Sequence, residues 1–232
     1  MRSMIVVPTY NERDNLAELA ERILGCEHGF WLTVVDDNSP DGTGKLADEL
    51  ARRHERLHVI HRPAKLGLGT AYVAGFRHAL DAGMDCVFEM DADLSHGPEY
   101  LPRFLEALGR CDAVFGSRYV AGGGTANWGL ARRLISRGGS LYARAILGLP
   151  VHDCTGGYNA FRRAVLEAID LERITSNGYS FQIELKYRCW RRGFRFVEVP
   201  IVFVDRRAGR SKMSARIFLE AMAKVWQLRL GR

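Results

Sequence analysis

The chain has 232 residues, a formal net charge of +6 and 47% hydrophobic residues. This length suits one sizeable domain with a buried core, and the composition is ordinary for a globular protein. No stretch of about 18 apolar residues is present, so we expect no transmembrane helix. The five cysteines form no C-x-x-C pair, which disfavours a zinc centre or a disulfide framework. The basic balance indicates an anionic partner, such as a nucleic acid, a membrane surface or a phosphorylated substrate.

The first half of the chain alternates short apolar runs with amphipathic stretches. Strands are predicted over 4–7, 32–35, 57–61, 86–90 and 113–116, and helices over 15–24, 43–53, 69–80 and 99–108. Because the strands are continuously apolar, we expect an α/β fold with a mostly parallel central sheet flanked by helices on both faces. The apolar stretch at the N-terminus is short, which is typical of a buried strand and not of a signal peptide.

The second half of the chain is less regular. A basic helix is predicted over 130–147, a helix over 181–192, a strand over 195–203 interrupted by Pro200, and a final helix after residue 212. A glycine-rich segment at 153–159 separates the first two helices. No internal repeat or linker divides the chain, so one domain is expected.

Two carboxylates, Asp91 and Asp93, directly follow the predicted strand 86–90. Like charges at this spacing repel each other, so a cation or a counter-charge usually accompanies them. The pair could hold one Mg²⁺, which in proteins takes one or two carboxylates together with substrate phosphates. The alternative is that Asp93 only caps the next turn while Asp91 faces solvent, since so short a motif also matches by chance.

Other polar loops also follow predicted strands, and ligands of parallel sheets bind at the carboxyl ends of the strands. Asp37 ends the second strand, where it could accept hydrogen bonds from a ribose or a base, or belong to an ordinary turn and helix cap. Tyr10 could pack on a base and Glu12 could make polar contacts, with a plain loop before a helix as the alternative. The glycines of 65–69 permit close approach of phosphates but lack the Walker and Rossmann spacings.

Four segments occur in an order that is typical of one enzyme family. They are P-T-Y-N-E from residue 8, D-D-N-S-P-D-G-T from 36, D-A-D-L-S-H from 91 and G-S-R-Y from 116. The chain resembles the inverting GT-A glycosyltransferases of family 2, and in particular the dolichol-phosphate (polyprenol-phosphate) mannose synthases. Segments from residues 134, 153 and 206 resemble the same branch. The resemblance implies a GT-A fold with a nucleotide-sugar-binding half (1–120), an acceptor-binding half (121–212) and a C-terminal amphipathic helix (213–232).

The resemblance also implies a reaction and its site residues. Mannose would pass from GDP-mannose to dolichyl or polyprenyl phosphate with inversion, using Mg²⁺ or Mn²⁺ bound by Asp91 and Asp93, with Arg118 as the third catalytic residue. Nucleotide-sugar contacts are implied for Pro8, Tyr10, Glu12, Val35, Asp37, Ala92, Ser95, Arg206 and Lys212. Acceptor-phosphate contacts are implied for Arg118, Arg133, Ser136 and Arg137. Ser95 stands where several family members have glutamine.

An ionised polyprenyl phosphate needs no strong general base, in contrast to a sugar hydroxyl. Catalysis would then depend on positioning and charge stabilisation, and we expect His96 to be an ordinary polar loop residue. The scattered cysteines fit a reducing cytoplasm, and a lipid acceptor implies peripheral association with the cytoplasmic face of a membrane. The final helix carries Phe218, Met222, Val225 and Trp226 on one face, which suits either a membrane interface or packing on the core.

Three other functions stay open at this point. The first is transfer of another hexose, for example from UDP-glucose, to polyprenyl phosphate. The second is transfer to a hydroxyl, with Glu184 as a possible base. The third, a nucleic-acid-binding module, is disfavoured because the arginines interleave with acidic loops and no helix-turn-helix, zinc or RNA-recognition signature is present. We therefore expect no nucleic-acid partner.

Overall fold

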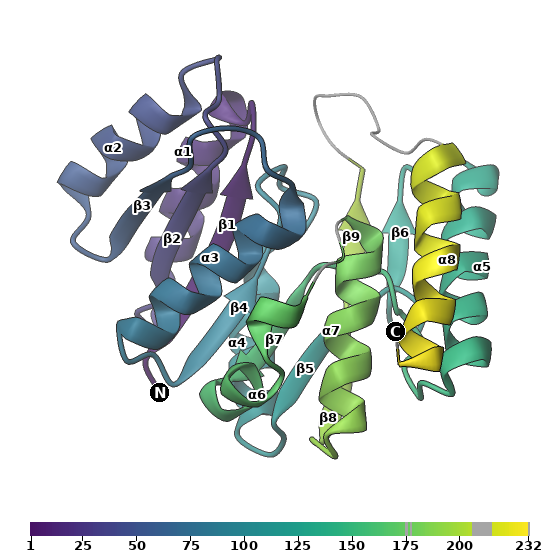
Figure 1. Ribbon diagram of the computed structural model, residues 1–232. Helices are drawn as coiled ribbons and strands as arrows, with labels where there is room; N and C mark the ends of the chain where they lie inside the picture. The colour runs from purple at the N-terminus through teal and green to yellow at the C-terminus, as the bar shows by residue number, and fades with distance from the viewer. Residues whose placement is uncertain (175, 177, 206–214, 232) are drawn as a thin grey trace.

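In the computed structural model, which describes residues 1–174, 176, 178–205 and 215–231, a seven-stranded sheet runs through the molecule (Figure 1). Its strand order is β3-β2-β1-β4-β7-β5-β8. The strands are β1 (Ser3–Thr9), β2 (Trp31–Asp36), β3 (Leu57–His61), β4 (Cys86–Glu89), β5 (Ala113–Ser117), β7 (Asn159–Arg162) and β8 (Phe196–Pro200). β7 is antiparallel to β4 and β5, and the other neighbouring pairs are parallel. A separate parallel pair joins β6 (Gly124–Ala126) to β9 (Val202–Val204).

Helices cover both faces of the sheet (Figure 1). They are α1 (Arg13–Leu24), α2 (Thr43–Arg53), α3 (Leu68–Asp81), α4 (Leu101–Leu108), α5 (Leu130–Leu147), α6 (Arg163–Ala168), α7 (Tyr179–Arg191) and α8 (Ala215–Leu230), with 3₁₀ turns η1 (Pro98–Tyr100) and η2 (Leu171–Arg173). Helices α5 and α8 lie side by side at the right of Figure 1, and α8 also packs against α7. Within the described part of the chain, every helix is too short or too polar to cross a bilayer.

The strands are apolar at successive positions because both faces of the sheet are buried. In β1, Met4 and Val6 belong to the same buried cluster as Phe76 of α3, whereas Ile5 and Val7 share a second cluster with α1 and α4. A strand covered on both faces has no solvent-facing positions at which polar residues are favoured. Burial of each large apolar side chain contributes about 1.5–3 kcal/mol, so these two clusters hold the helices on the sheet.

The predicted elements of the first half are confirmed, and those of the second half only in part. The predicted helices 43–53 and 130–147 have the observed bounds. The predicted strand 195–203 is wrong as a single strand, because β8 ends at Pro200 and β9 pairs with β6 in the other sheet. Proline has no amide hydrogen for a ladder, which favours a break at this point. The sequence pattern does not predict β6, β7 or α6, all of which are short.

Candidate active site

A cleft of about 330 Å³ opens at the carboxyl ends of β1, β2 and β4, and we call it the strand-end cleft. The parallel register places these strand ends at one edge of the sheet, with Thr9 of β1 opposite Asp36 of β2. Seven residues that the sequence predicts for a substrate site line this cleft together: Pro8, Tyr10, Glu12, Asp37, Asp91, Ala92 and Asp93. Loops that are far apart in the sequence therefore form one site.

The two carboxylates after β4 are held in defined positions. The Tyr72 hydroxyl donates to Asp91 Oδ1 at 3.3 Å, and the backbone N–H of Asp91 donates to His96 Nδ1 at 3.2 Å. Asp93 Oδ1 accepts from the backbone N–H of Ser95 at 3.1 Å and from the Ser95 hydroxyl. The described residues contain no group of three or more His, Cys, Asp and Glu side chains that would enclose a metal. Two carboxylates nevertheless suit Mg²⁺ or Mn²⁺ when a diphosphate and water supply the other ligands.

Two residues with predicted nucleotide-sugar contacts, Val35 and Ser95, do not line the strand-end cleft. Ser95 is only 1% exposed and its hydroxyl is bonded to Asp93, so it orients that carboxylate and does not line the cleft. The side chain of Val35 is fully buried in the core, and its strand pairs on both sides. Sequence position near a strand end does not reveal which face a side chain occupies. Arg206 and Lys212 lie outside the described residues.

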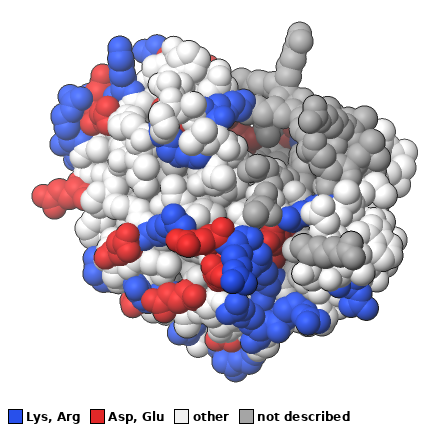
Figure 2. Space-filling view, in the orientation of Figure 1, with Lys and Arg blue, Asp and Glu red and all other residues white. Residues whose placement is uncertain are grey.

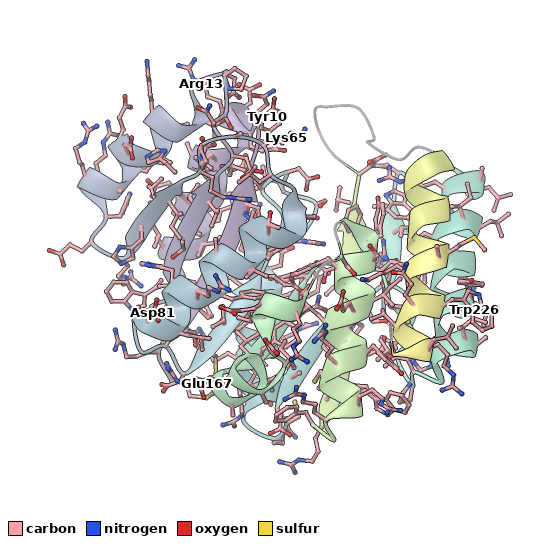
Figure 3. The ribbon with its side chains drawn as sticks, viewed as in Figure 1. Tyr10, Arg13, Lys65, Asp81, Glu167 and Trp226 are labelled. Carbon is pink, nitrogen blue, oxygen red and sulfur yellow. The ribbon has the colours of Figure 1, made fainter. Side chains whose placement is uncertain are left out.

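Asp37 and Tyr10 form one wall of the strand-end cleft. Arg62 lies 2.8 Å from Asp37 Oδ1, and the backbone N–H of Leu66 donates to Oδ2 at 3.2 Å. Burial raises the pKa of Asp37, while the Arg62 charge acts in the opposite direction. The Lys65 ammonium lies 3.9 Å from the centre of the Tyr10 ring, and Figure 3 shows the two side chains together. An aromatic ring beside a cation and a carboxylate is suited to a nucleobase and ribose.

A second cavity, of about 120 Å³, lies among α5, α7 and α8, and we call it the helix cavity. Asp91, Thr155, Gly157 and Tyr179 line both this cavity and the strand-end cleft, so the two spaces are adjacent. Most other lining residues are apolar or aromatic, and they include Trp128, Ile135, Tyr142, Ile183, Phe203, Met222 and Val225. The helix cavity is therefore an apolar space that ends beside the acidic pair.

Arg118 supplies a fixed positive charge to the helix cavity. Its Nε and Nη2 donate to the Asp153 carboxylate at 2.6 and 2.7 Å, and Nη2 also donates to the Thr155 hydroxyl at 2.9 Å. Both charged side chains are almost fully buried. Although burial raises the pKa of Asp153, the Arg118 guanidinium lowers it to about 2. A bidentate pair of this kind fixes the plane of the guanidinium as well as its charge.

Helix α5 presents a different arginine from those predicted. Arg132 and Ser136 line the helix cavity, whereas Arg133 and Arg137 are exposed and do not. Arg132 Nη1 also lies 2.7 Å from the carboxylate of Asp205. Residues four apart share a helix face, while the next residue along points about 100° away. Of the residues on α5 with predicted acceptor contacts, Ser136 therefore lines the helix cavity and Arg133 and Arg137 do not, whereas Arg132, for which no contact is predicted, does.

A buried polar network supports the segment where the two spaces meet. Lys186, which is fully buried, donates to the carbonyl oxygens of Asp153 at 2.7 Å and Gly156 at 2.9 Å. Glu89 is also fully buried and accepts from Gln182 at 3.2 Å. Burial lowers the pKa of Lys186 and raises that of Glu89. Nothing in the sequence pattern distinguishes this lysine from those on an exposed helix face, so sequence reasoning misses it.

Neither His96 nor Glu184 is placed as a general base. His96 is 2% exposed, its Nδ1 accepts from the Asp91 backbone, and burial lowers its pKa, so the ring is neutral. Glu184 is 1% exposed, is bonded to Ser176 and Arg188, and lines neither space. The hypothesis of a hydroxyl acceptor activated by Glu184 therefore has no support from the geometry.

Comparison with known proteins gives this site its context. Residues 4–170 match the model of Glycosyl transferase family 2, and the chain belongs to that family. It is 49% identical over 232 residues to the polyprenol monophosphomannose synthase of Mycolicibacterium smegmatis, covering 98% of this chain and 88% of the relative. It is 50% identical over 225 residues to the undecaprenyl-phosphate mannosyltransferase of Micrococcus luteus, covering 97% and 93%. The predicted resemblance to the polyprenol-phosphate mannose synthases is confirmed.

The solved structures bear on the fold. Glucosyl-3-phosphoglycerate synthase from Mycobacterium tuberculosis, in complex with Mn²⁺, UDP and glucosyl-3-phosphoglycerate, matches with a TM-score of 0.71. The match covers 99% of this chain and 80% of that chain at 20% sequence identity. Together with the family match, it confirms the predicted α/β fold of the GT-A glycosyltransferases.

Proposed function

We propose that the protein transfers mannose from GDP-mannose to a polyprenyl or dolichyl phosphate, with inversion at the sugar carbon. The two relatives at 49% and 50% identity, whose names specify mannosyl transfer to polyprenol or undecaprenyl phosphate, support this activity. The observation that carries the proposal is the shared wall formed by Asp91, Thr155, Gly157 and Tyr179. A nucleotide sugar in the strand-end cleft and a phosphate in the helix cavity would meet at this wall.

The strand-end cleft is the proposed donor site. Tyr10, Asp37 and Lys65 would hold the guanosine part, and Pro8, Glu12 and Ala92 are further residues of the cleft lining. Asp91 and Asp93 would hold Mg²⁺ or Mn²⁺ together with the diphosphate. When bound, such an ion neutralises the negative charge that develops on the departing diphosphate. Arg206 and Lys212 keep their proposed roles as donor contacts on the resemblance alone.

The helix cavity is the proposed acceptor site. An apolar wall suits the prenyl chain, and Arg118 and Arg132 would hold the phosphate at the inner end beside Ser136. The attacking phosphate oxygen is already ionised at neutral pH, so no side chain has to remove a proton. Asp153 orients Arg118, which makes positioning and charge stabilisation the main contributions of the chain to the reaction.

The outer surfaces of α5 and α8 support peripheral association with a membrane, proposed at its cytoplasmic face. Large apolar side chains that are 49–73% exposed occur along both helices: Leu130, Leu134, Leu141, Trp226 and Leu230. Such helices can lie in a membrane interface, with their arginines near anionic headgroups. Sedimentation with phosphatidylglycerol vesicles tests this assignment. On the face shown in Figure 2, Lys and Arg gather below the centre with Asp and Glu beside them.

The test of the proposed function is transfer of labelled sugar in a matrix of donors and acceptors. GDP-mannose and UDP-glucose are each offered with undecaprenyl phosphate or with undecaprenol, in the presence of Mg²⁺, Mn²⁺ or a chelator. We expect metal-dependent transfer from GDP-mannose to the phosphate only. Transfer from UDP-glucose instead would change the donor and keep the acceptor, whereas transfer to undecaprenol alone would overturn the acceptor assignment.

A further inference from the structure

Trp128 lies in the segment between β6 and α5 and belongs to the wall of the helix cavity. It is only 8% exposed. The Arg132 guanidinium carbon lies 4.0 Å from the centre of the Trp128 ring, and that of Arg118 lies 5.4 Å away. The Phe203 and Trp128 rings pack in a T-shaped arrangement with 5.2 Å between their centroids. One indole therefore contacts both arginines of the cavity.

The indole N–H of Trp128 is buried and has no hydrogen-bond acceptor among the described residues. Buried polar groups are nearly always paired in folded proteins, because an unpaired donor loses its bond to water without replacement. Among the described residues, side-chain atoms without such a bond also occur in His78, Ser140 and Asn159, which line neither the strand-end cleft nor the helix cavity. The remaining case is Oδ1 of Asp37, which lines the strand-end cleft but is an acceptor and lies 2.8 Å from the Arg62 guanidinium. Trp128 thus combines an unused donor with a place on a cavity wall.

The surroundings of this donor select an anion. A guanidinium has five N–H donors. Arg118 uses three of them, two in hydrogen bonds to Asp153 and one in a hydrogen bond to Thr155. Arg132 brings a second positive charge to the same ring. A phosphate oxygen is the acceptor that such a group of donors favours, since bonds to a charged acceptor are the stronger ones.

We propose that the Trp128 indole N–H donates a hydrogen bond to the phosphate of the isoprenyl acceptor and so helps to position it between Arg118 and Arg132. This assignment rests on the proposed function, because it adds a binding residue to the acceptor site of that reaction. It explains why a tryptophan suits this position better than phenylalanine, whose ring would cover the arginines equally but has no N–H.

The first test observes the N–H directly. The chain has four tryptophans, so the protein labelled with ¹⁵N at the indole nitrogens gives four signals, and Trp128→Phe identifies the one of interest. We expect citronellyl phosphate, a short isoprenyl phosphate, to move the Trp128 proton signal downfield. The alcohol citronellol, which lacks the phosphate, is the matched ligand control. The exposed Trp226 is an internal reference for effects of the prenyl chain on α8.

The second test is kinetic and uses two matched variants. Trp128→Phe is expected to raise the KM for undecaprenyl phosphate about 10-fold and to leave the KM for GDP-mannose unchanged. Trp190→Phe, in α7 and outside both spaces, is expected to change neither value. Thermal unfolding of both variants shows whether each is folded. The shift caused by the ligand is measured in the wild-type protein, and Trp128→Phe serves there only to assign the signal.

The outcomes separate this inference from the proposed function. If the wild-type enzyme uses undecaprenyl phosphate but the Trp128 signal does not move when citronellyl phosphate binds, the assignment of Trp128 is overturned and the function stands. An unchanged acceptor KM in Trp128→Phe leads to the same conclusion. If the wild-type enzyme neither binds nor mannosylates isoprenyl phosphates, the proposed function and the role of Trp128 both fail.

Discussion

The strand-end cleft and the helix cavity lie side by side but are built in different ways. The cleft takes its polar residues from loops that directly follow parallel strands, so Asp37 and Asp91 are fixed by the sheet register. The cavity takes most of its apolar residues from single faces of α5, α7 and α8. Its other lining residues come from loops and strands outside these helices: Asp91, His96, Arg118, Trp128, Thr155, Gly156, Gly157 and Phe203. A strand end delivers a whole loop to one edge, whereas a helix delivers only the residues that share a face.

This difference separates two kinds of chemistry. The cleft gathers carboxylates and a cation beside an aromatic ring, which suits a metal-bound nucleotide sugar. The cavity gathers two arginines beside Trp128 in a mostly apolar lining, which suits a phosphate on a hydrocarbon chain. Variants on the two sides should therefore affect different substrates, and variants at their junction should affect the fold as well.

The largest effect is expected at the junction, for Asp153→Asn. This variant leaves the buried Arg118 charge without its carboxylate, which typically costs about 3–5 kcal/mol of unfolding free energy. Urea unfolding at pH 7 measures the loss. Glu106→Gln, which removes an exposed ion pair with Arg110, is the control and should change stability by less than about 1 kcal/mol. A similar small loss for both variants would show that the junction is not held by this pair.

The same pair predicts a pH dependence of defined sign. The Asp153 pKa is about 2 in the folded protein, below its ordinary value of 3.8, so the unfolded chain binds the proton first as the pH falls. The stability from this group is therefore present above about pH 4 and is lost as the pH falls towards 2. The stability difference between wild type and Asp153→Asn should narrow over that window. A constant difference between pH 5 and 2 would contradict the assignment.

On the donor side, Asp91→Asn is expected to lower mannosyl transfer about 100- to 1000-fold, because the amide keeps the volume but removes the charge that would hold the metal. Binding of citronellyl phosphate, measured by calorimetry, should persist because the arginines are untouched. Asp81, labelled in Figure 3, is the last residue of α3 and does not line the strand-end cleft. Asp81→Asn is therefore the control and should retain wild-type transfer. Full metal-dependent activity in Asp91→Asn would remove Asp91 from the proposed metal site.

On the acceptor side, Arg132→Gln is expected to raise the KM for undecaprenyl phosphate about 10- to 100-fold. The KM for GDP-mannose should change little. Arg133→Gln is the matched control at the next position of α5 and should change the KM for undecaprenyl phosphate far less, since its side chain is exposed and does not line the cavity. Steady-state kinetics in detergent micelles keeps membrane attraction out of the comparison. Equal effects of the two substitutions would mean that the cavity is not where the phosphate binds.

The smallest effect is expected from two neighbouring glycines of α5. A Cβ at Gly138 or Gly139 meets no atom within 4 Å, so alanine at either position should stabilise the helix by about 0.5–1 kcal/mol. Only Gly139 of the pair lines the helix cavity, so Gly139→Ala should also raise the acceptor KM about 3- to 10-fold. Unfolding curves and acceptor kinetics of the two variants, taken together, distinguish a filled cavity from a stiffened helix.

The sequence predicts the strand-end cleft well because its residues follow the strands directly. Tyr10, Asp37, Asp91 and Asp93 line it as expected, since a strand–loop–helix order and a parallel sheet leave their loops only one edge to occupy. Ser95 is the exception among its neighbours, because whether a loop side chain faces the cleft or the core depends on local turn geometry.

The helix cavity could not be predicted to the same depth. The periodicity of 130–147 gives the helix and its bounds, but which of Arg132, Arg133 and Arg137 faces inward depends on how α5 rotates against α7 and α8. Trp128 carries no signal in the sequence, because its unpaired N–H exists only once the surrounding packing excludes water. The same holds for Lys186, whose buried bonds to two carbonyl oxygens require a chain folded around it.

By itself, the sequence determined the α/β order, the strand ends that carry chemistry and the family to which the chain belongs, since these follow from periodicity and from short local motifs. The tertiary structure decided the inserted antiparallel β7, the pairing of Arg118 with Asp153 and the side of α5 that meets the cavity. The physical reason is that local preferences act within a few residues, whereas burial and pairing join residues that are far apart in the chain.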